Sequence, residues 1–200
     1  NNLAEIEASD VHRRLCLEKG KYILLSAHRE ENIDTEKNFL SLFNAINKMA
    51  ERYDMPILYS CHPRSRNRLA TSGFELDSRV IQHEPLGFHD YNCLQMNAFA
   101  VVSDSGTLPE ESSFFTSIGY PFPAICIRTS TERPEAIDKG GFIIAGIDER
   151  SLLQAVDTAV ELCRNAQYGI PVPDYVDENV STKVVKIVQS YVSIVNKMVW

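Results

Sequence analysis

The sequence has few cysteines and no motif that pairs them. Its five cysteines, Cys16, Cys61, Cys93, Cys126 and Cys163, are scattered over 200 residues with no CxxC spacing. Because the count is odd and the spacing wide, a disulfide framework and a zinc site are both disfavoured. We therefore expect buried thiols in a reducing compartment, the cytoplasm, and no metal.

Long apolar runs and positive charge are also lacking. No uninterrupted apolar stretch approaches the roughly 20 residues that span a bilayer. The formal net charge of −7 argues against a general binder of nucleic acid or membrane surfaces, which usually presents a basic face. We predict neither kind of partner, so any phosphate that binds must be held by local groups.

Phosphate-loop signatures are missing too, since neither GxxxxGK[ST] nor GxGxxG occurs. What the sequence does contain is a regular alternation of strand-like and helix-like segments. Strand-like runs lie at 22–27, 55–61, 80–82, 98–104, 123–128 and 141–146, and each precedes a helical pattern. This alternation predicts an α/β fold, a Rossmann-like parallel sheet with helices on both faces.

The two ends of the chain differ from this rhythm. We expect residues 1–20 to be a linker or helix from a missing N-terminal domain, and residues 21–165 to form the nucleotide-binding domain. Residues 166–200 predict a connection, broken by proline and glycine, and then a helix with an apolar stripe. That helix is either the last core-packing helix, which the pattern alone favours, or one that crosses to the N-terminal domain.

Ligands of open α/β sheets bind beyond the carboxyl ends of the strands, so the residues there are the candidates for chemistry. After the first strand, "SAHREEN" supplies His28, Arg29, Glu31 and Asn32. His28 suits donation to a phosphate oxygen or a proton shuttle, because its ordinary pKa is near neutral. A histidine satisfied by loop backbone is the alternative.

The second strand is followed by "SCHPRSRNR", the densest positive cluster of this acidic chain. Its His62 and Arg64 suit capture of a phosphate or carboxylate. A solvated helix face is the simpler alternative, which the sequence alone favours.

The fourth strand is followed by "SDSGTLPEES", residues 103–112. Asp104 or Ser105 is expected to cap the next helix, with Pro109 in its first turn. The same exposed amides could instead hold an anion. In that interpretation a diphosphate sits at Ser105 and Gly106, and a glutamate takes a vicinal diol such as ribose.

The fifth strand is followed by "RTSTERPEA", in which Arg133 precedes a helix-starting proline and Glu132 precedes Arg133. An arginine in this place can fork onto phosphate. Helix capping with a surface ion pair is the simpler alternative.

Taken together, "SAHREEN", "SDSGTLPEE" and "RTSTERPEA" resemble, in order and spacing, the C-terminal half of the non-hydrolysing UDP-N-acetylglucosamine 2-epimerases. The resemblance covers roughly residues 15–165. It implies two Rossmann-like domains of the glycosyltransferase-B type with the active site between them, and this chain would be the nucleotide-holding one.

The resemblance also implies the roles of individual residues. Ser105 and Gly106 would contact phosphate, Arg133 the diphosphate region, Glu111 the ribose and Tyr91 the uracil. His28 would assist departure and return of the UDP oxygen, while the carboxylates that move the C2 proton would lie in the N-terminal half. The implied partners are a UDP-2-acetamido sugar, that N-terminal domain and a second copy in a homodimer, with no cofactor.

Departures from the family pattern point to one branch. Thr107 stands where a second glycine is usual, Pro109 replaces a glutamine, and "FFTSIGYPFPAI" is longer than the common step. These variants resemble the enzymes that form UDP-N-acetyl-L-fucosamine from UDP-2-acetamido-2,6-dideoxy-L-talose. Four alternatives stay open: an epimerase forming UDP-N-acetylmannosamine, a hydrolysing relative, a glycosyltransferase and a non-catalytic module that senses nucleotide sugars.

Overall fold

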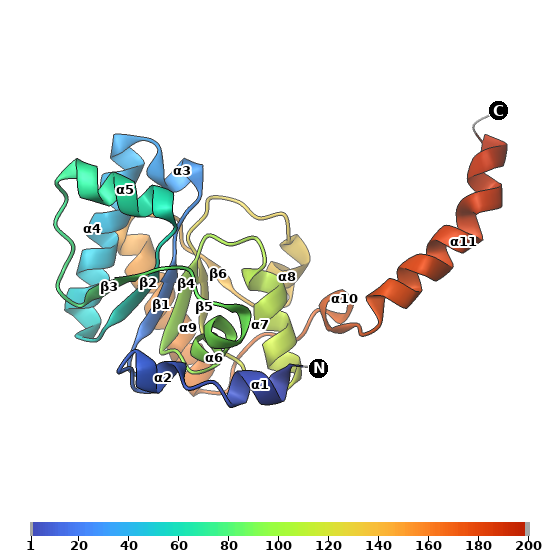
Figure 1. Ribbon diagram of the computed structural model, residues 1–200, viewed down its shortest axis with the longest axis horizontal. Helices are drawn as coiled ribbons and strands as arrows, with labels where there is room; N and C mark the ends of the chain where they lie inside the picture. Colours follow the sequence, from blue (N-terminus) through green and yellow to red (C-terminus); the bar gives the residue numbers. More distant parts are fainter. Residues whose placement is uncertain (1, 199–200) are drawn as a thin grey trace.

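Six parallel strands form one sheet in the order β3-β2-β1-β4-β5-β6 (Figure 1). The strands are β1 (Ile23–Ser26), β2 (Ile57–Ser60), β3 (Val80–His83), β4 (Ala100–Ser103), β5 (Ala124–Cys126) and β6 (Ile143–Ile144). The computed structural model describes residues 2–198, except for the side chains of residues 196 and 198. The predicted Rossmann-like α/β fold is confirmed.

The strand order reverses between β1 and β4, and this reversal positions the site. Ser26 at the end of β1 pairs in register with Ser60 of β2 and Ser103 of β4. The chain therefore leaves these three strands at one level, on the same edge of the sheet. Loops after β1 and β4 then turn to opposite faces and leave a crevice, where open α/β sheets bind ligands.

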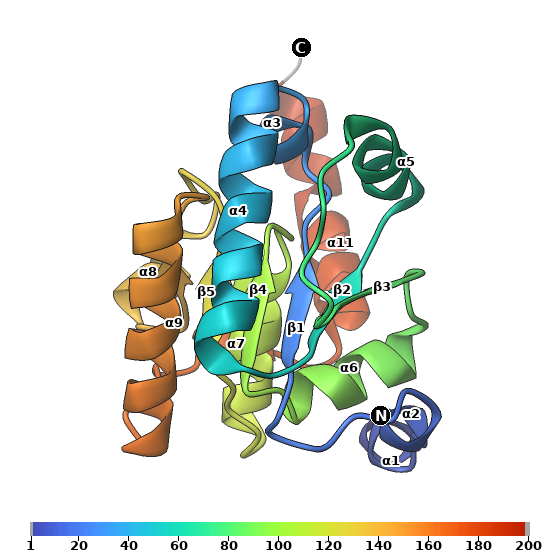
Figure 2. The same ribbon diagram turned by 90° about the vertical axis from the view of Figure 1, so that its left-hand side faces the viewer.

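Alternate side chains of each strand enter two separate cores. Ile23 and Leu25 point into one, and Leu24 points into the other. The first core is covered by α4 (Glu36–Tyr53) and α9 (Glu149–Arg164), which lie side by side (Figure 2). Helices α6 (Phe88–Met96) and α7 (Leu108–Ser117) cover the second. Strands buried on both faces explain why the apolar runs are continuous rather than alternating.

Three further helices lie at the carboxyl edge of the sheet. They are α3 (Glu30–Ile33), α5 (Pro63–Ser72) and α8 (Pro134–Asp138), and each follows the carboxyl end of a strand. Helix α5 ends at Gly73 in the left-handed conformation, with φ of 70°, which glycine adopts without steric cost.

The N-terminal segment packs on the sheet domain. Helices α1 (Leu3–Glu7) and α2 (Val11–Arg14) contact α6, and Ile6, Val11 and Leu17 are buried in the second core. Residues 2–20 therefore pack against the second core of the sheet domain, on the side of α6. Their predicted origin in a missing domain stays a prediction, and position 1 lies outside the described residues.

The C-terminal segment is clamped and then leaves the domain. A Cβ atom on Gly169 would lie 2.5 Å from the carbonyl group of Gly140, so only glycine fits this close approach. Beyond α10 (Pro173–Val176), α11 (Val180–Met198) projects away from the sheet (Figure 1). Its apolar residues are exposed, including Ile187 at 58% and Val188 at 57%. The interpretation of α11 as a core-packing helix is wrong, because its apolar residues stay exposed in the described part of the chain. Positions 199 and 200 lie outside the described residues.

The cysteines follow the expectation only in part. All five are free thiols; Cys61, Cys93 and Cys126 are buried, Cys163 is half-buried and Cys16 is exposed. Cys16 departs from the prediction because it lies in the turn after α2, with a left-handed φ of 52°, rather than in a strand or helix face. Within residues 2–198, no helix is both long and apolar enough to cross a bilayer.

Protonation of His12 should couple the N-terminal segment to pH. The His12 ring lies 3.0 Å from the Tyr22 hydroxyl, and burial, with the Lys19 charge, lowers the pKa of His12. A lowered pKa means that the stability contributed by neutral His12 is present above its unfolded pKa of about 6.5 and is lost as pH falls below it. Denaturant titrations at about pH 7.5 and about pH 5.5 measure how much unfolding free energy is lost on acidification. This loss should be smaller for His12→Gln than for wild type.

Lys19→Met is the matched variant for this prediction. Removing the neighbouring charge brings the His12 pKa closer to its ordinary value, so this variant should also lose less stability on acidification. Equal losses in all three proteins would contradict the role of His12.

Candidate functional site

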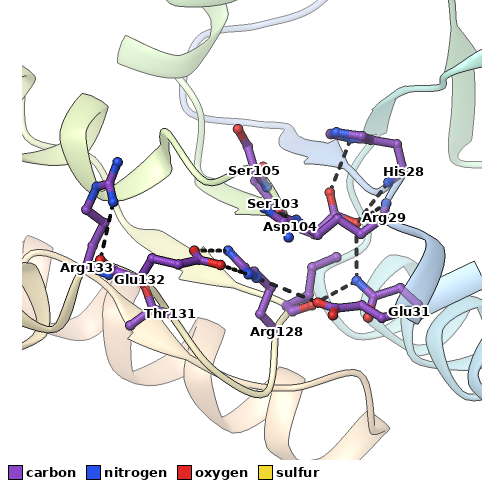
Figure 3. A network of polar contacts seen from close by, with 12 residues as sticks. His28, Arg29, Glu31, Ser103, Asp104, Ser105, Arg128, Thr131, Glu132 and Arg133 are labelled. Carbon is purple, nitrogen blue, oxygen red and sulfur yellow. Dashed lines mark hydrogen bonds and ion pairs between the residues drawn. The ribbon is translucent and has the colours of Figure 1, made fainter.

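The buried carboxylate of Asp104 organises the loop after β1. Asp104 follows β4 and is fully buried. Its Oδ2 accepts hydrogen bonds from the backbone amides of His28 and Arg29, at 2.9 Å and 2.8 Å, and from Asn32 Nδ2 at 3.1 Å (Figure 3). Asn32 also donates to the carbonyl of Ile127 beyond β5. One carboxylate thus ties together the ends of three neighbouring strands.

His28 is held over the same carboxylate. Its Nδ1 lies 3.2 Å from Oδ1 of Asp104, an ion-pair distance without good hydrogen-bond alignment. The side chain of His28 is 45% exposed, so the rest of the ring is open to a ligand. A histidine fixed by a buried carboxylate on one side and open on the other suits hydrogen bonding or proton transfer to a bound group.

The turn after β4 lies against the Arg29 side chain. Arg29 Nε donates to the carbonyl of Asp104 at 3.0 Å, and its Nη2 would lie 3.5 Å from a Cβ atom on Gly106. The Ser105 amide is already used, because it donates to the Ser103 hydroxyl at 3.0 Å. An anion at this turn would therefore meet the Gly106 amide, the Ser105 hydroxyl and the Arg29 guanidinium rather than two free amides.

The predicted cap of α7 is wrong. The helix begins at Leu108 with Thr107 as N-cap, and no side chain caps its first amides. Asp104 cannot serve because its carboxylate is occupied by the loop after β1, while the Ser105 hydroxyl accepts from the Thr107 amide within the turn. Pro109 does lie in the first turn, as predicted.

Glu111 and Tyr91 come from neighbouring helices. The Glu111 carboxylate accepts from Gln95 Nε2 of α6 and from the Thr107 hydroxyl, each at 2.7 Å. Tyr91 is partly buried on α6 against the second core, and burial, with the Glu111 charge, raises the pKa of its hydroxyl. Its phenol therefore stays neutral and can only act as an apolar surface or a neutral hydrogen-bonding group.

Two arginines follow β5 and both are paired with carboxylates, of which the pairing of Arg128 with Glu132 is drawn in Figure 3. Arg128 is buried and donates to both oxygens of Glu132, at 2.9 Å and 2.7 Å, and this pairing lowers the pKa of Glu132 to about 2. Arg128 Nε also lies 3.6 Å from Glu31. Arg133 Nε donates to Glu110 of α7 at 2.7 Å. A phosphate at Arg133 would have to share or replace the Glu110 contact.

The basic cluster after β2 is largely neutralised by its own chain. Arg64 pairs with Glu30 and, at 2.9 Å, with Asp34. His62 caps α5 through its ring and lies with its centroid 6.4 Å from that of His28. Arg64 thus fits the solvated helix face that was the simpler alternative for this cluster. His62 lies beside the site.

Unsatisfied buried polar atoms gather at this edge of the sheet. Within residues 2–198, the buried side-chain atoms without a hydrogen-bond partner are Asp104 Oδ1, Arg128 Nε and Gln95 Oε1. Such atoms cost stability and are rare in native proteins, so their concentration marks a functional site. The described residues contain no group of three side chains suited to a metal ion.

Sequence reasoning missed the most deeply buried members of this site. Asp104 was assigned only to a cap, although its position after a fully buried strand was a usable signal. Gln95 carried no signal, because it lies in the last turn of α6 and only the tertiary structure brings it to Glu111 of α7.

Comparisons with known proteins agree with the geometry. The sequence profile of the family described as UDP-N-acetylglucosamine 2-epimerase matches residues 1–189. The chain belongs to this family. A UDP-N-acetylglucosamine 2-epimerase of Methanocaldococcus jannaschii is 31% identical over 148 residues, covering 72% of this chain and 39% of that protein. The chain thus spans about two-fifths of that curated relative.

Solved structures of the family superpose on the whole domain. That of UDP-N-acetylglucosamine 2-epimerase from Rickettsia bellii has a TM-score of 0.84 at 36% identity, covering 100% of this chain and 52% of that one. The M. jannaschii epimerase in complex with UDP-GlcNAc and UDP has a TM-score of 0.79 at 27% identity, covering 94% and 51%. The chain therefore corresponds to about half of each epimerase structure.

The Asp104 carboxylate should be essential to the fold of this edge. Replacing it by asparagine in Asp104→Asn removes the negative charge that the three donors share, and a neutral amide oxygen in the Oδ2 position accepts from them more weakly. Hydrogen bonds to charged groups contribute about 1.5–3 kcal/mol each, so we expect a loss of about 3 kcal/mol of unfolding free energy. Denaturant unfolding measures this loss.

The same substitution at an exposed carboxylate provides the control. Asp174→Asn on α10 should change the unfolding free energy by less than about 0.5 kcal/mol, as surface substitutions usually do. Equal effects of the two substitutions would contradict the organising role of Asp104.

Proposed function

We propose that this chain is the UDP-binding half of a UDP-sugar 2-epimerase, an isomerase. The observation that carries the proposal is the Asp104-centred cluster, which holds His28 and Arg29 against the turn at Ser105 and Gly106. The cluster lies where the strand order reverses, as a nucleotide site of this fold class would. Family membership and the relatives bound to UDP support the same ligand.

The proposed contacts distribute the nucleotide over the strand ends. Ser105 and Gly106 take phosphate, Arg133 takes the diphosphate region after leaving Glu110, and Glu111 takes the ribose. Tyr91 lies near the uracil. Arg29 supports the phosphate turn, whereas Glu31, Asn32 and Glu132 build the edge through Arg128 and Asp104.

The chemistry explains why a leaving-group site is needed. The C2 hydrogen of the sugar is not acidic until the C1–O bond to UDP breaks and positive charge develops at C1. Loss of the C2 proton then forms the C1=C2 bond, and the C1–O electrons remain on the diphosphate. A proton returns to the opposite face of C2 as the diphosphate oxygen re-adds to C1. Amides, Arg133 and His28 would stabilise the diphosphate charge in both directions.

For the product, we propose UDP-N-acetyl-L-fucosamine. Thr107, Pro109 and the long segment before β5 support this branch. The printed names of several relatives support the alternative, in which UDP-N-acetylglucosamine is converted to UDP-N-acetylmannosamine. Both reactions invert C2 of a UDP-2-acetamido sugar and use the same leaving group.

We further propose an N-terminal half that faces this site, with the complete protein a cytoplasmic homodimer. The proton-transferring carboxylates would lie in that half. Residues 1–20 and 166–200, which flank the domain of residues 21–165, would connect the two halves. The relatives are about twice as long as this chain, which supports the second half. The exposed apolar residues of α11 support a partner surface there.

Isotope exchange at C2 tests the reaction. The complete protein, incubated in deuterated water with UDP-N-acetylglucosamine and with UDP-2-acetamido-2,6-dideoxy-L-talose, should incorporate deuterium at C2 of one of them, detected by mass spectrometry. This chain alone should bind UDP in a calorimetric titration without exchange, because it would lack the proton-transferring carboxylates.

The other outcomes identify the rival functions. Free sugar as product would indicate a hydrolysing enzyme, and transfer to an acceptor without exchange would indicate a glycosyltransferase. UDP binding without turnover in the complete protein would indicate a sensing module. Turnover by this chain alone would contradict the division of labour between the halves.

The apolar stripe of α11 should contribute to stability only in the complete protein. Val188→Asp puts a charge in the middle of the stripe and should lower the stability of the complete protein by about 3 kcal/mol, since a buried unpaired charge is costly. Ser193→Asp, on the opposite side of the same helix, is the control and should change it little. In this chain alone, where Val188 is 57% exposed, neither substitution should matter. Equal effects in the complete protein would contradict docking through this stripe.

A further inference from the structure

The Glu111 carboxylate is held from two sides by side chains of different elements. Gln95 donates to Oε2 from α6, and Thr107 donates to Oε1 from the N-cap of α7, each at 2.7 Å. Each oxygen can accept further hydrogen bonds. The plane of the carboxylate is therefore fixed while its outer acceptor positions stay available.

Thr107 also connects Glu111 to the phosphate turn. Its hydroxyl lies 3.0 Å from the Ser105 hydroxyl. Because a carboxylate only accepts, the Thr107 hydrogen goes to Glu111, so the hydrogen shared with Ser105 must come from Ser105. In the free chain the donors thus run in one direction, from Ser105 through Thr107 to Glu111, and the Ser105 hydroxyl must turn its hydrogen away from Thr107 to contact a phosphate.

Gln95 is retained at a cost that packing does not explain. Its side chain is fully buried, and its Oε1 has no hydrogen-bond partner among residues 2–198. A buried acceptor without a partner destabilises a fold, and an apolar side chain of equal shape would avoid the penalty. The Nε2 contact with Glu111 is the one feature of this side chain that an apolar residue could not reproduce.

We propose that Thr107 and Gln95 are positioning residues that preset Glu111 to accept both hydroxyls of a vicinal diol, and so make this site selective for ribonucleotides. The proposal rests on the proposed function, which assigns Glu111 to the ribose. A carboxylate fixed before binding accepts the two hydroxyls without first being ordered, and pre-organisation of this kind raises affinity. Thr107 additionally couples ribose recognition to the Ser105 phosphate contact.

The test compares the affinities of this chain for UDP and for 2′-deoxy-UDP by calorimetry. Wild type should prefer UDP by about tenfold, the loss expected for one charge-assisted hydrogen bond. Thr107→Val keeps the shape but removes the hydroxyl, and should reduce the preference to about threefold or less. Thr107→Ser should retain the wild-type preference. Gln95→Met should reduce the preference as Thr107→Val does.

The stability of Gln95→Met separates positioning from a structural role. Because the variant loses one hydrogen bond to Glu111 but also removes an unpartnered buried acceptor, its unfolding midpoint should change little while its preference for UDP falls. An unchanged preference in Thr107→Val and Gln95→Met, with wild type selective, would overturn the positioning roles and leave Glu111 on the ribose. Equal binding of both nucleotides by wild type would overturn the ribose role of Glu111 itself, and absence of UDP binding would overturn the proposed function.

Discussion

The acceptance of three hydrogen bonds by one buried carboxylate underlies the whole carboxyl edge of this sheet. Asp104 leaves β4 fully buried and collects the His28 and Arg29 amides with the Asn32 side chain. Without this carboxylate, the His28 and Arg29 amides of the loop after β1 would lose their hydrogen-bond acceptor at the end of β4. His28 and Arg29 owe their places to this single charge, and through Asn32 the end of β5 is attached as well. Geometry of this kind needs tertiary contact between segments about 75 residues apart.

Two arginines near Asp104 are paired in advance with carboxylates of the same chain, while Arg29 donates to the Asp104 carbonyl. Arg133 contacts Glu110, and Arg128 contacts Glu132 and Glu31. An anion that binds here competes with these carboxylates for the two arginines, so the protein needs no basic surface. The same local pairing makes a net charge of −7 compatible with the proposed diphosphate site. The charges that matter act over a few ångströms, where screening by salt is weak.

The domain differs sharply between its interior and its C-terminal helix. The two cores contain the apolar residues of β1, β2, β4 and β5, whereas Ile81 of the edge strand β3 is 41% exposed. Helix α11 has an equally regular apolar stripe and leaves it exposed. Periodicity predicts that a helix will bury one face, but it contains no information about which surface will cover that face. A partner beyond this chain satisfies the pattern as well as an internal core does.

The sequence by itself determined the six strands, the long helices α4 and α9, and the strand-end segments that bear the chemistry, because apolar periodicity and glycine or proline breaks are local signals. Only the tertiary structure decided which of those polar residues meet. It turned Asp104 from a helix cap into the centre of the site, paired Arg64 with Asp34 and brought the buried Gln95 to Glu111. These contacts depend on strand order and helix packing, which bring together residues far apart in the chain. A local pattern of residues does not determine which distant segment it will meet.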